Sequence, residues 1–222
     1  MRRKRFLSLT AMVLTAVLLS SCGADVAEHV EIKTIEPPEN GWTHEQISEV
    51  TYLCGEPLSL PCKLEDLPDD FEIGKVTSRN EGDELHAYIT VNGQDSNFYT
   101  ARLLLDGESV GLAHYYENGT DKIVFSIDPP PDLYGRDIFV INGINQNSLF
   151  SEVEQALGEF VVVSDYDIPC FYDHKIINSE YPGEHIRVMI VNDYEDEEMG
   201  IIDEAGIIGF SYSLFEVTKK ND

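Results

Sequence analysis

The sequence predicts an α+β domain made mainly of antiparallel β-sheet meanders, with two short helices at about residues 63–67 and 149–157. Two observations predict this fold class. Short runs rich in β-branched and aromatic residues recur at roughly ten-residue spacing, and turn signals such as Asn92-Gly93 separate them, as in antiparallel hairpins. Helical spacing of apolar residues is confined to short segments, so helices are a minor part of the expected fold.

The first element is an export signal. Residues 2–5 are basic, and about fifteen apolar, helix-forming residues follow, fewer than the roughly twenty that a transmembrane helix needs. The run Leu19-Ser20-Ser21-Cys22 resembles the lipobox of bacterial lipoprotein precursors, in which the cysteine is diacylated and the chain is cut just before it.

This resemblance implies a signal peptide over residues 1–21 and lipid attachment at Cys22. Two acyl chains anchor a protein stably, so we expect a lipoprotein held at the extracytoplasmic face of the cell membrane. The alternative is a plain secreted protein in which Cys22 has no special role.

Residues 22–41 are expected to form an acidic tether, because they are polar and end in the stiff Pro37-Pro38 segment. Residues 42–222 then form a single extracytoplasmic domain. Two regions of it, at about 42–128 and 138–218, share the order of a short helix followed by strands, which suggests two similar halves. No residue-level similarity accompanies this order, so it does not establish a duplication.

The first region begins with a predicted β-hairpin, because apolar residues alternate between positions 47 and 60 around a turn at 54–57. The helix at 63–67 follows and stops at Pro68. Four strands then predict an antiparallel meander, at residues 85–91, 98–105, 109–116 and 122–127. The proline-rich run 128–132 connects this meander to the second region.

The second region holds the clearest helix, at 149–157. Leu149, Val153 and Leu157 repeat at helical spacing, Ser148 offers an N-cap oxygen, and Gly158 supplies the C′ position. Strands are expected around this helix at residues 138–141, 160–163, 168–172, 185–191 and 206–217.

The mature chain is strongly acidic. The sequence has 15 basic and 41 acidic residues; without the four basic residues of the leader, 11 basic residues face 41 acidic ones, a formal charge of −30. Such a field repels nucleic acid and anionic lipid headgroups and attracts cations and basic surfaces. We therefore expect a basic protein or peptide as partner, and no nucleic acid. Solubility through self-repulsion is the alternative meaning of the charge.

Three cysteines remain besides Cys22, namely Cys54, Cys62 and Cys170. An odd number outside the cytoplasm allows at most one disulfide and leaves a thiol. Cys54 and Cys62 are the local candidates, but residues near a hairpin turn need not meet the narrow geometry of a disulfide. No spacing of cysteine and histidine indicates zinc.

Two segments resemble uncharacterised lipoproteins of Gram-positive gut bacteria. Residues 142–158 contain Asn142-Gly143-Ile144, Ser148, Glu152-Val153 and Ala156-Leu157-Gly158, similar to the GI…S…EEV…LG-P signature of those proteins, and residues 60–67 are similar to their LP-C-T…DL segment. A more distant resemblance is to the fold of β-lactamase-inhibitor proteins and small outer-membrane assembly lipoproteins. It implies a helix that ends in Leu-Gly with antiparallel strands behind it, and neither resemblance implies an activity.

The sequence lacks a GxSxG elbow, an HExxH helix, a P-loop and a GxGxxG turn. Asp173 and His174 have the chemistry of a catalytic pair, but adjacent strand residues point to opposite faces. We therefore expect a non-enzymatic binding module without a cofactor. The competing class is a hydrolase acting on cell-wall or dietary polymers. A deep cleft that gathers histidines and carboxylates in mutual hydrogen bonds would favour the hydrolase, and a smooth sheet face the binding module.

A run of acidic residues is a candidate calcium site, because Asp193, Asp196 and Glu198 offer oxygen ligands. The run lacks the alternating acidic positions and the turn glycine of an EF-hand loop, so a solvated loop is the alternative.

Tyrosines on the predicted strands are candidate contacts for a protein partner, because tyrosine is a common interface anchor. This partner-binding sheet face would include Tyr88, Tyr99, Tyr115 and Tyr116. Core and cross-strand packing is the alternative role of these rings.

Overall fold

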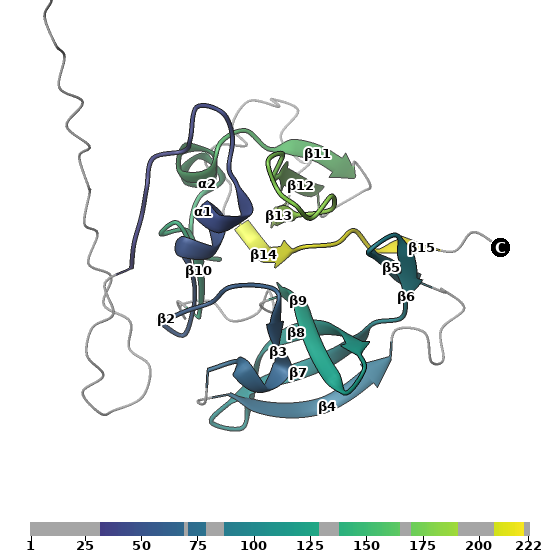
Figure 1. Cartoon of the computed structure of the whole chain (residues 1–222). Coiled ribbons are helices and arrows are strands. Elements are labelled where there is room, and N and C mark those ends of the chain that lie inside the picture. Colours follow the sequence, from purple (N-terminus) through teal and green to yellow (C-terminus); the bar gives the residue numbers. More distant parts are fainter. Residues whose placement is uncertain are drawn as a thin grey trace, which may run out of the picture.

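The computed structural model describes residues 32–68, 71–78, 87–128, 138–164, 170–190 and 207–219 (Figure 1). Within these ranges the protein is mostly antiparallel β-sheet with two short α-helices, which confirms the prediction at this level. The predicted signal peptide, Cys22 and the acidic run with Asp193, Asp196 and Glu198 lie outside the described residues.

A large antiparallel sheet forms the frame of the molecule, in the strand order β11-β12-β13-β14-β9-β8-β7-β4. Its strands are β4 (Glu72–Ser78), β7 (Tyr99–Leu105), β8 (Glu108–Asn118), β9 (Asp121–Asp128), β11 (Val161–Ser164), β12 (Cys170–Lys175), β13 (His185–Ile190) and β14 (Ile207–Ser213). The short strand β3 (Cys62–Lys63) also pairs with β9.

The pairing of β14 with β9 joins the two predicted regions in one sheet. Tyr212 lies opposite Ile127 and Ser213 opposite Ser126. Figure 1 shows β14 between the upper strands β11–β13 and the lower strands β7–β9. Strands from 42–128 and 138–218 therefore share one set of backbone hydrogen bonds.

Two small sheets flank the large one. In the first, β1 (Thr51–Leu53) lies between β10 (Phe139–Ile141) and β2 (Glu56–Pro57). In the second, β5 (Ala87–Val91) lies between β15 (Thr218–Lys219) and β6 (Gln94–Ser96).

The predicted four-strand meander is wrong in its first strand. Strand β5 pairs with β6 and β15, and β4 takes the place beside β7. The reason lies at Asn92 and Gly93, whose positive φ angles of 52° and 76° make a two-residue turn that returns the chain at once along β6. Strand β4 gives a weak sequence signal, because a bulge between Ile73 and Val76 interrupts its alternation.

The first helix is α1 (His44–Glu49). The predicted hairpin was expected to begin at residue 47, which lies inside this helix. A capping box starts it: the Thr43 hydroxyl accepts from the backbone N–H of Gln46, and the Gln46 side chain accepts from that of Thr43. The predicted hairpin is thus limited to β1 and β2. The predicted helix at 63–67 is a single 3₁₀ turn, Leu64–Asp66.

The helix predicted at 149–157 is confirmed as α2 (Phe150–Leu157). Its N-cap is Leu149, whose backbone N–H donates to the Glu152 carboxylate at 2.8 Å. The predicted N-cap, Ser148, has another role, because its hydroxyl accepts from the backbone N–H of Asn145.

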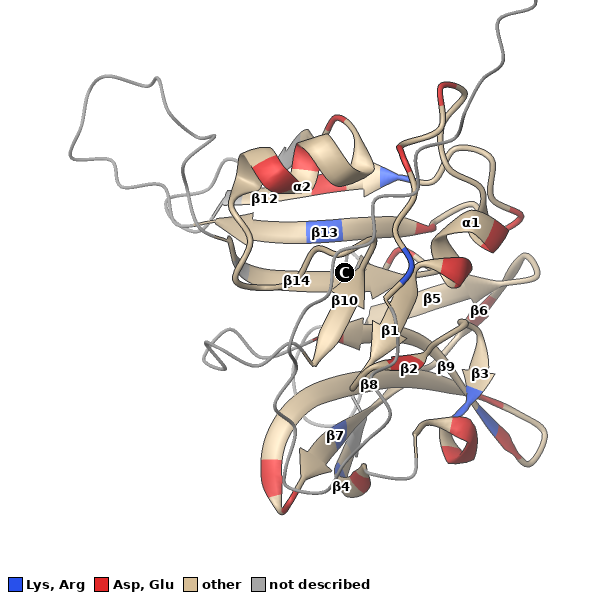
Figure 2. Ribbon diagram, turned by 90° about the vertical axis from the view of Figure 1, so that its left-hand side faces the viewer, with Lys and Arg blue, Asp and Glu red and all other residues tan. Residues whose placement is uncertain are grey.

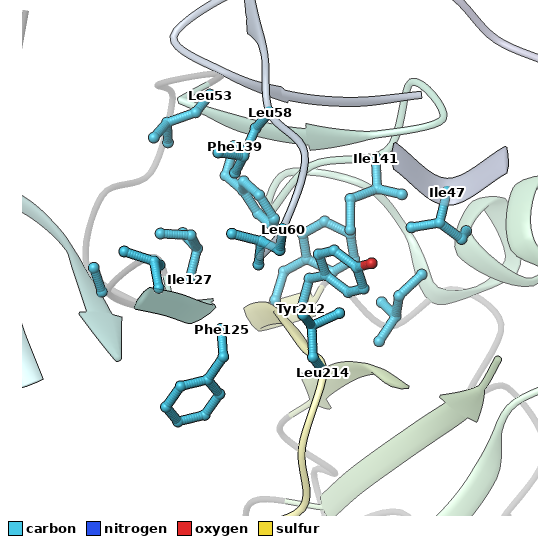
Figure 3. Packing of buried hydrophobic residues seen from close by; sticks show 14 of the residues in the cluster. Ile47, Leu53, Leu58, Leu60, Phe125, Ile127, Phe139, Ile141, Tyr212 and Leu214 are labelled. Carbon is cyan, nitrogen blue, oxygen red and sulfur yellow. The ribbon is translucent and has the colours of Figure 1, made fainter. Parts of the chain in front are cut away.

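Part of the hydrophobic core lies between the large sheet and the layer of α1, α2, β1 and β10. Figure 3 shows Leu60, Phe139 of β10 and Tyr212 of β14 meeting in it, with Ile47 of α1 alongside. The only tryptophan, Trp42, is buried and donates its indole N–H to the carbonyl of Leu157 at 2.7 Å. This bond connects the segment before α1 to the end of α2.

Residues 32–41, the last part of the predicted tether, lie along the domain. The side chain of Asn142 accepts from the backbone N–H of Ile35 at 2.8 Å and donates to the Ile35 carbonyl at 2.9 Å. Its amide also donates to the carbonyl of Ala156 at 2.7 Å. Asn142 therefore fastens the N-terminal segment to the end of β10 and to α2.

Candidate functional site

One face of the large sheet carries a continuous row of polar residues. On β13, Ile186, Val188 and Ile190 are buried in the core. His185 and Arg187 alternate with them along the strand, so their side chains face the opposite side of the sheet. The cross-strand partners of His185 continue this side across six strands. The polar row consists of Lys175, His185, Ser213, Ser126, His114 and Thr100, each paired in register with the next.

The residues of the polar row other than Thr100 line a cavity of about 1070 Å³. Aromatic and aliphatic side chains also line the cavity, namely Phe98, Phe125, Phe171, Phe215 and Met189. At its rim Val161 is 65% exposed, Ile177 74% and Val217 44%. Apolar side chains that stay exposed around a concave site are typical of ligand-binding grooves, and the volume matches that of small-molecule sites.

A chain of hydrogen bonds runs through the buried side of the cavity. The Thr100 hydroxyl lies 2.9 Å from Nδ1 of His114, and Nε2 of His114 lies 2.7 Å from Oδ2 of Asp128. The Ser126 hydroxyl donates to Oδ1 of Asp128 at 3.1 Å. Because a carboxylate only accepts, Nε2 donates to Asp128. Both ring nitrogens of His114 are therefore bonded within the protein.

Arg187 and Asp173 form a bidentate ion pair in the cavity. Nε and Nη2 of Arg187 donate to the two carboxylate oxygens at 2.7 and 2.8 Å. This bond raises the pKa of Arg187, and the charges of Asp173, Asp128 and Glu216 add to the effect. The guanidinium also lies 5.9 Å from the centre of the Phe171 ring.

His185 also lines the cavity. The side chain is 7% exposed, and Nδ1 donates to the carbonyl of Gly183 at 2.7 Å. Since a carbonyl only accepts, Nδ1 carries the proton and Nε2 is an acceptor in the neutral ring. Among the described residues, no hydrogen-bond partner of Nε2 is found.

Among the described residues that line the cavity, carboxylates outnumber cations. Its lining contains Asp128, Asp173, Glu159 and Glu216, against Arg187 and Lys175. Both cations are paired, Arg187 with Asp173 and Lys175 with Glu216 at 2.9 Å. Elsewhere, Figure 2 shows acidic residues on both helices, α1 and α2.

Asp173 and His174 do not form a hydrogen-bonded pair, as the strand geometry predicted. Asp173 bonds Arg187, whereas Nδ1 of His174 donates to the Glu159 carbonyl at 2.8 Å and the ring packs on Phe160. Nε2 of His174 is buried without a partner among the described residues, and burial lowers the pKa of this ring.

A second buried polar cluster lies behind β14, on the core side. The Glu184 carboxylate is 2% exposed and accepts from the Tyr212 and Ser179 hydroxyls, while Nδ1 of His44 lies 3.0 Å away. The bond to Glu184 raises the pKa of His44. Burial of the Tyr212 hydroxyl is the main cause that raises its pKa well above the ordinary value, and the charge and hydrogen bond of Glu184 add to the effect. The cluster holds α1 against the start of β13.

The predicted interface tyrosines do not gather on one exposed face. Tyr99 and Tyr115 stack with ring centres 5.4 Å apart, and Tyr115 is 2% exposed. Tyr116 packs against Phe125 and Phe215. Tyr88 is on β5, in a different sheet. Partner binding through these residues stays a prediction.

The structure holds Cys62 as a free thiol, so it forms no bond with Cys54. Burial, followed by the charge of Asp66, raises the pKa of Cys62 to about 11, so the thiol is protonated at neutral pH. In the described part of the chain, no group of three or more His, Cys, Asp or Glu side chains is arranged to hold a metal ion.

Comparison of the chain with protein-family models, with curated proteins and with solved structures gave no match. The resemblances noted in the sequence therefore stay predictions. None of the helices in the described ranges is long and apolar enough to cross a membrane.

Sequence reasoning missed the polar row and the cavity, although one signal was present. The stretch 185–190 alternates polar and apolar residues, which marks a strand with a polar face. Which residues complete the row depends on the pairing of β14 with β9, and no local pattern fixes that pairing.

Proposed function

We propose that this chain is a lipid-anchored, extracytoplasmic binding module with an α+β domain and no catalytic role, whose cavity holds a short segment of a basic peptide or protein. The supporting observation is a cavity of about 1070 Å³ in which the ring of His114 and the carboxylate of Asp128 are bonded to each other. The excess of carboxylates among its described lining residues suits a basic ligand.

A hydrolase is the second candidate function. It is favoured by the His114–Asp128 hydrogen bond in the cavity, with Ser126 on the same carboxylate. A general base must reach a substrate proton within hydrogen-bond distance, and both nitrogens of His114 are already bonded. The Thr100 hydroxyl, the group that His114 could activate, belongs to a buried residue and does not line the cavity. These contacts favour binding over catalysis.

Calcium binding by Asp193, Asp196 and Glu198 is a separate hypothesis about residues outside the described ranges. A ligand specific for the folded state raises the melting temperature, so an unchanged melting temperature in excess calcium would exclude it.

Filling the cavity tests the proposed function. Ser211 is half-buried on β14 beside Arg187 and lines the cavity, so Ser211→Phe places a ring in the binding space. Tri- and tetrapeptides of basic, neutral and acidic composition are titrated into ¹⁵N-labelled protein. We expect basic peptides to shift cavity resonances in the wild type and Ser211→Phe to abolish the shifts.

The matched control is Thr90→Phe, which adds the same ring to an exposed strand position outside the cavity. It should bind peptides as the wild type does. Peptide binding that survives in Ser211→Phe, or that is absent from the wild type, would contradict the proposal. Release of products from peptide or glycan polymers would favour the hydrolase.

A further inference from the structure

The sheet face of the cavity contains a row of three residues that pair across β12, β13 and β14. Asp173 lies opposite Arg187, and Arg187 lies opposite Ser211. All three residues line the cavity, the side chain of Arg187 is 38% exposed and Ser211 is half-buried. Adjacent strands of a sheet are about 4.8 Å apart, so one small polar group of a ligand can reach both the guanidinium and the hydroxyl.

Arg187 and Ser211 have hydrogen-bonding capacity beyond their bonds within the protein. A guanidinium has five N–H groups, and the carboxylate of Asp173 accepts from two of them, at 2.7 and 2.8 Å. The other three N–H groups of Arg187 can only donate. Among the described residues, no hydrogen bond of these three groups or of the Ser211 hydroxyl is found. A ligand group with both an acceptor and a donor would complement this pair of side chains.

The charges of the cavity favour a neutral acceptor at Arg187. The ion pair of Arg187 and Asp173 has no net charge. Lys175, the other lysine or arginine of the described lining, is paired with Glu216 at 2.9 Å. A carboxylate or phosphate would lose its hydration in the cavity without gaining an unpaired cation. A carbonyl oxygen accepts the same hydrogen bonds and loses less hydration, so an amide carbonyl suits Arg187 better than an anion.

Apolar side chains lie next to Arg187 on two sides. Along the strands, Met189 lies opposite Phe171, and both are half-buried residues that line the cavity. Gly209 lies on the other side of Met189, and its lack of a side chain leaves room for Met189, since a Cβ atom at Gly209 would be 2.9 Å from Cε of Met189. Across the sheet, Val161 on β11 is 65% exposed. A group bound at Arg187 can therefore carry apolar side chains on either side.

We propose, on the basis of the proposed function, that the cavity binds a peptide through its main chain. A backbone carbonyl of the ligand accepts from the remaining N–H groups of Arg187, and the N–H of the same ligand residue, which points the same way in an extended chain, donates to the Ser211 hydroxyl. Neighbouring side chains contact Phe171, Met189 and Val161. The main chain is common to all peptides, so this contact adds affinity without selecting a sequence, and the preference for basic peptides comes from the carboxylates of the lining.

Ester substitution tests this inference, because an ester in place of a peptide bond removes one N–H and weakens the carbonyl as an acceptor. The parent ligand is the basic tetrapeptide Lys-Leu-Leu-Lys with both ends blocked, and its peptide bonds are replaced one at a time. The peptides are titrated into the mature chain, residues 22–222 with Cys22→Ala so that no lipid is attached, and followed by NMR. We expect one ester to bind about fivefold to tenfold more weakly than the parent, as the loss of one hydrogen bond predicts, and the others to bind as the parent does.

Removing the Ser211 hydroxyl identifies its partner in the ligand. In Ser211→Ala the parent should bind as weakly as the sensitive ester binds to the wild type, and the sensitive ester should lose no further affinity. The matched control is Ser109→Ala, which removes an exposed hydroxyl from β8 outside the cavity and should leave all affinities unchanged.

The outcomes distinguish this inference from the proposed function. Equal binding of the parent and all esters, with all binding lost in Ser211→Phe, would overturn main-chain recognition and leave the binding module in place. Equal weakening of the parent and the sensitive ester in Ser211→Ala would contradict the bond to the hydroxyl. N-Acetylglucosamine also contains an amide and is titrated as a further probe. Failure of every peptide to bind, with or without binding of this sugar in their place, would overturn both proposals.

Discussion

At the scale of single residues, Glu184 shows how the protein keeps a charge in its core. The carboxylate is buried, and hydroxyl groups of Tyr212 and Ser179 and the ring of His44 surround it with hydrogen-bond donors. A buried carboxylate without such partners would cost several kcal/mol in real proteins, about the loss expected from breaking a buried pair. The same bonds join β14, the start of β13 and α1.

His44 gives this cluster a pH dependence. The bond to Glu184 raises the pKa of His44 above its ordinary value of 6.5, with the charges of Glu184 and Glu180 in support. The folded protein therefore holds the proton more tightly than the unfolded chain. This contribution to stability is fully present below pH 6.5 and is lost as the pH rises through the folded pKa.

We therefore expect the free energy of unfolding of the wild type to exceed that of His44→Gln most at about pH 5.5 and least at about pH 8.5. Urea titrations at several pH values measure the difference. His174 is common to both proteins, so its lowered pKa, which acts in the opposite direction, cancels. A difference that does not vary with pH would contradict the assignment to His44.

At the scale of elements, Asn142 connects three of them. Asn142 directly follows β10 and has a positive φ of 51°, and the φ of Gly143 after it is 82°. The Asn142 side chain forms hydrogen bonds with the backbone of Ile35 and of Ala156. Asparagine suits this place because it tolerates the left-handed region and carries both a donor and an acceptor.

Replacing Asn142 with glycine keeps the backbone conformation and removes the three side-chain bonds. We expect Asn142→Gly to lower the free energy of unfolding by about 2–3 kcal/mol, since typical hydrogen bonds contribute about 1 kcal/mol each. The control is Asn92→Gly, at a turn residue with φ of 52° and an exposed side chain, where we expect a change within about 0.5 kcal/mol. Equal losses in the two variants would mean that the bonds of Asn142 contribute nothing.

The elements also show what the sequence could predict. Strands β7, β8 and β9 and helix α2 lie close to their predicted ranges, because turn pairs and apolar periodicity are local signals. Helix α1 was missed, although Thr43 and Gln46 have the spacing of a capping box. Strand β6 was missed because its polar residues resemble a turn, and strand predictions could not give the partner of β5.

At the scale of the whole molecule, the candidate site depends on contacts that are distant in sequence. Ser213 meets Ser126 across 87 positions of the chain, and this single pairing brings His185 and His114 to one face. Period-two alternation reveals that a strand has a polar side, but it does not reveal which strands lie next to each other. The cavity could therefore be recognised only in the folded molecule.

The predicted lipid attachment also belongs to the scale of the whole molecule. We expect Cys22→Ala to release the protein from the membrane fraction or to block processing of the leader, because the acyl chains would have no attachment point. Membrane fractionation, with mass spectrometry of the N-terminal peptide for acyl groups, measures this. A Cys22→Ala protein that is matured and still bound to membranes would contradict the lipoprotein assignment.

The bonds between Ile35 and Asn142 set the reach of such an anchored protein. A tether free up to residue 41 would span nineteen residues from Cys22, about 65 Å when fully extended, whereas a chain fastened to the domain at Ile35 leaves thirteen, about 45 Å. The shorter tether would then keep the domain close to the bilayer surface. Ligands would be bound near the membrane surface. A pulling force on the anchor would act on the end of β10 before it acted on the strands that line the cavity.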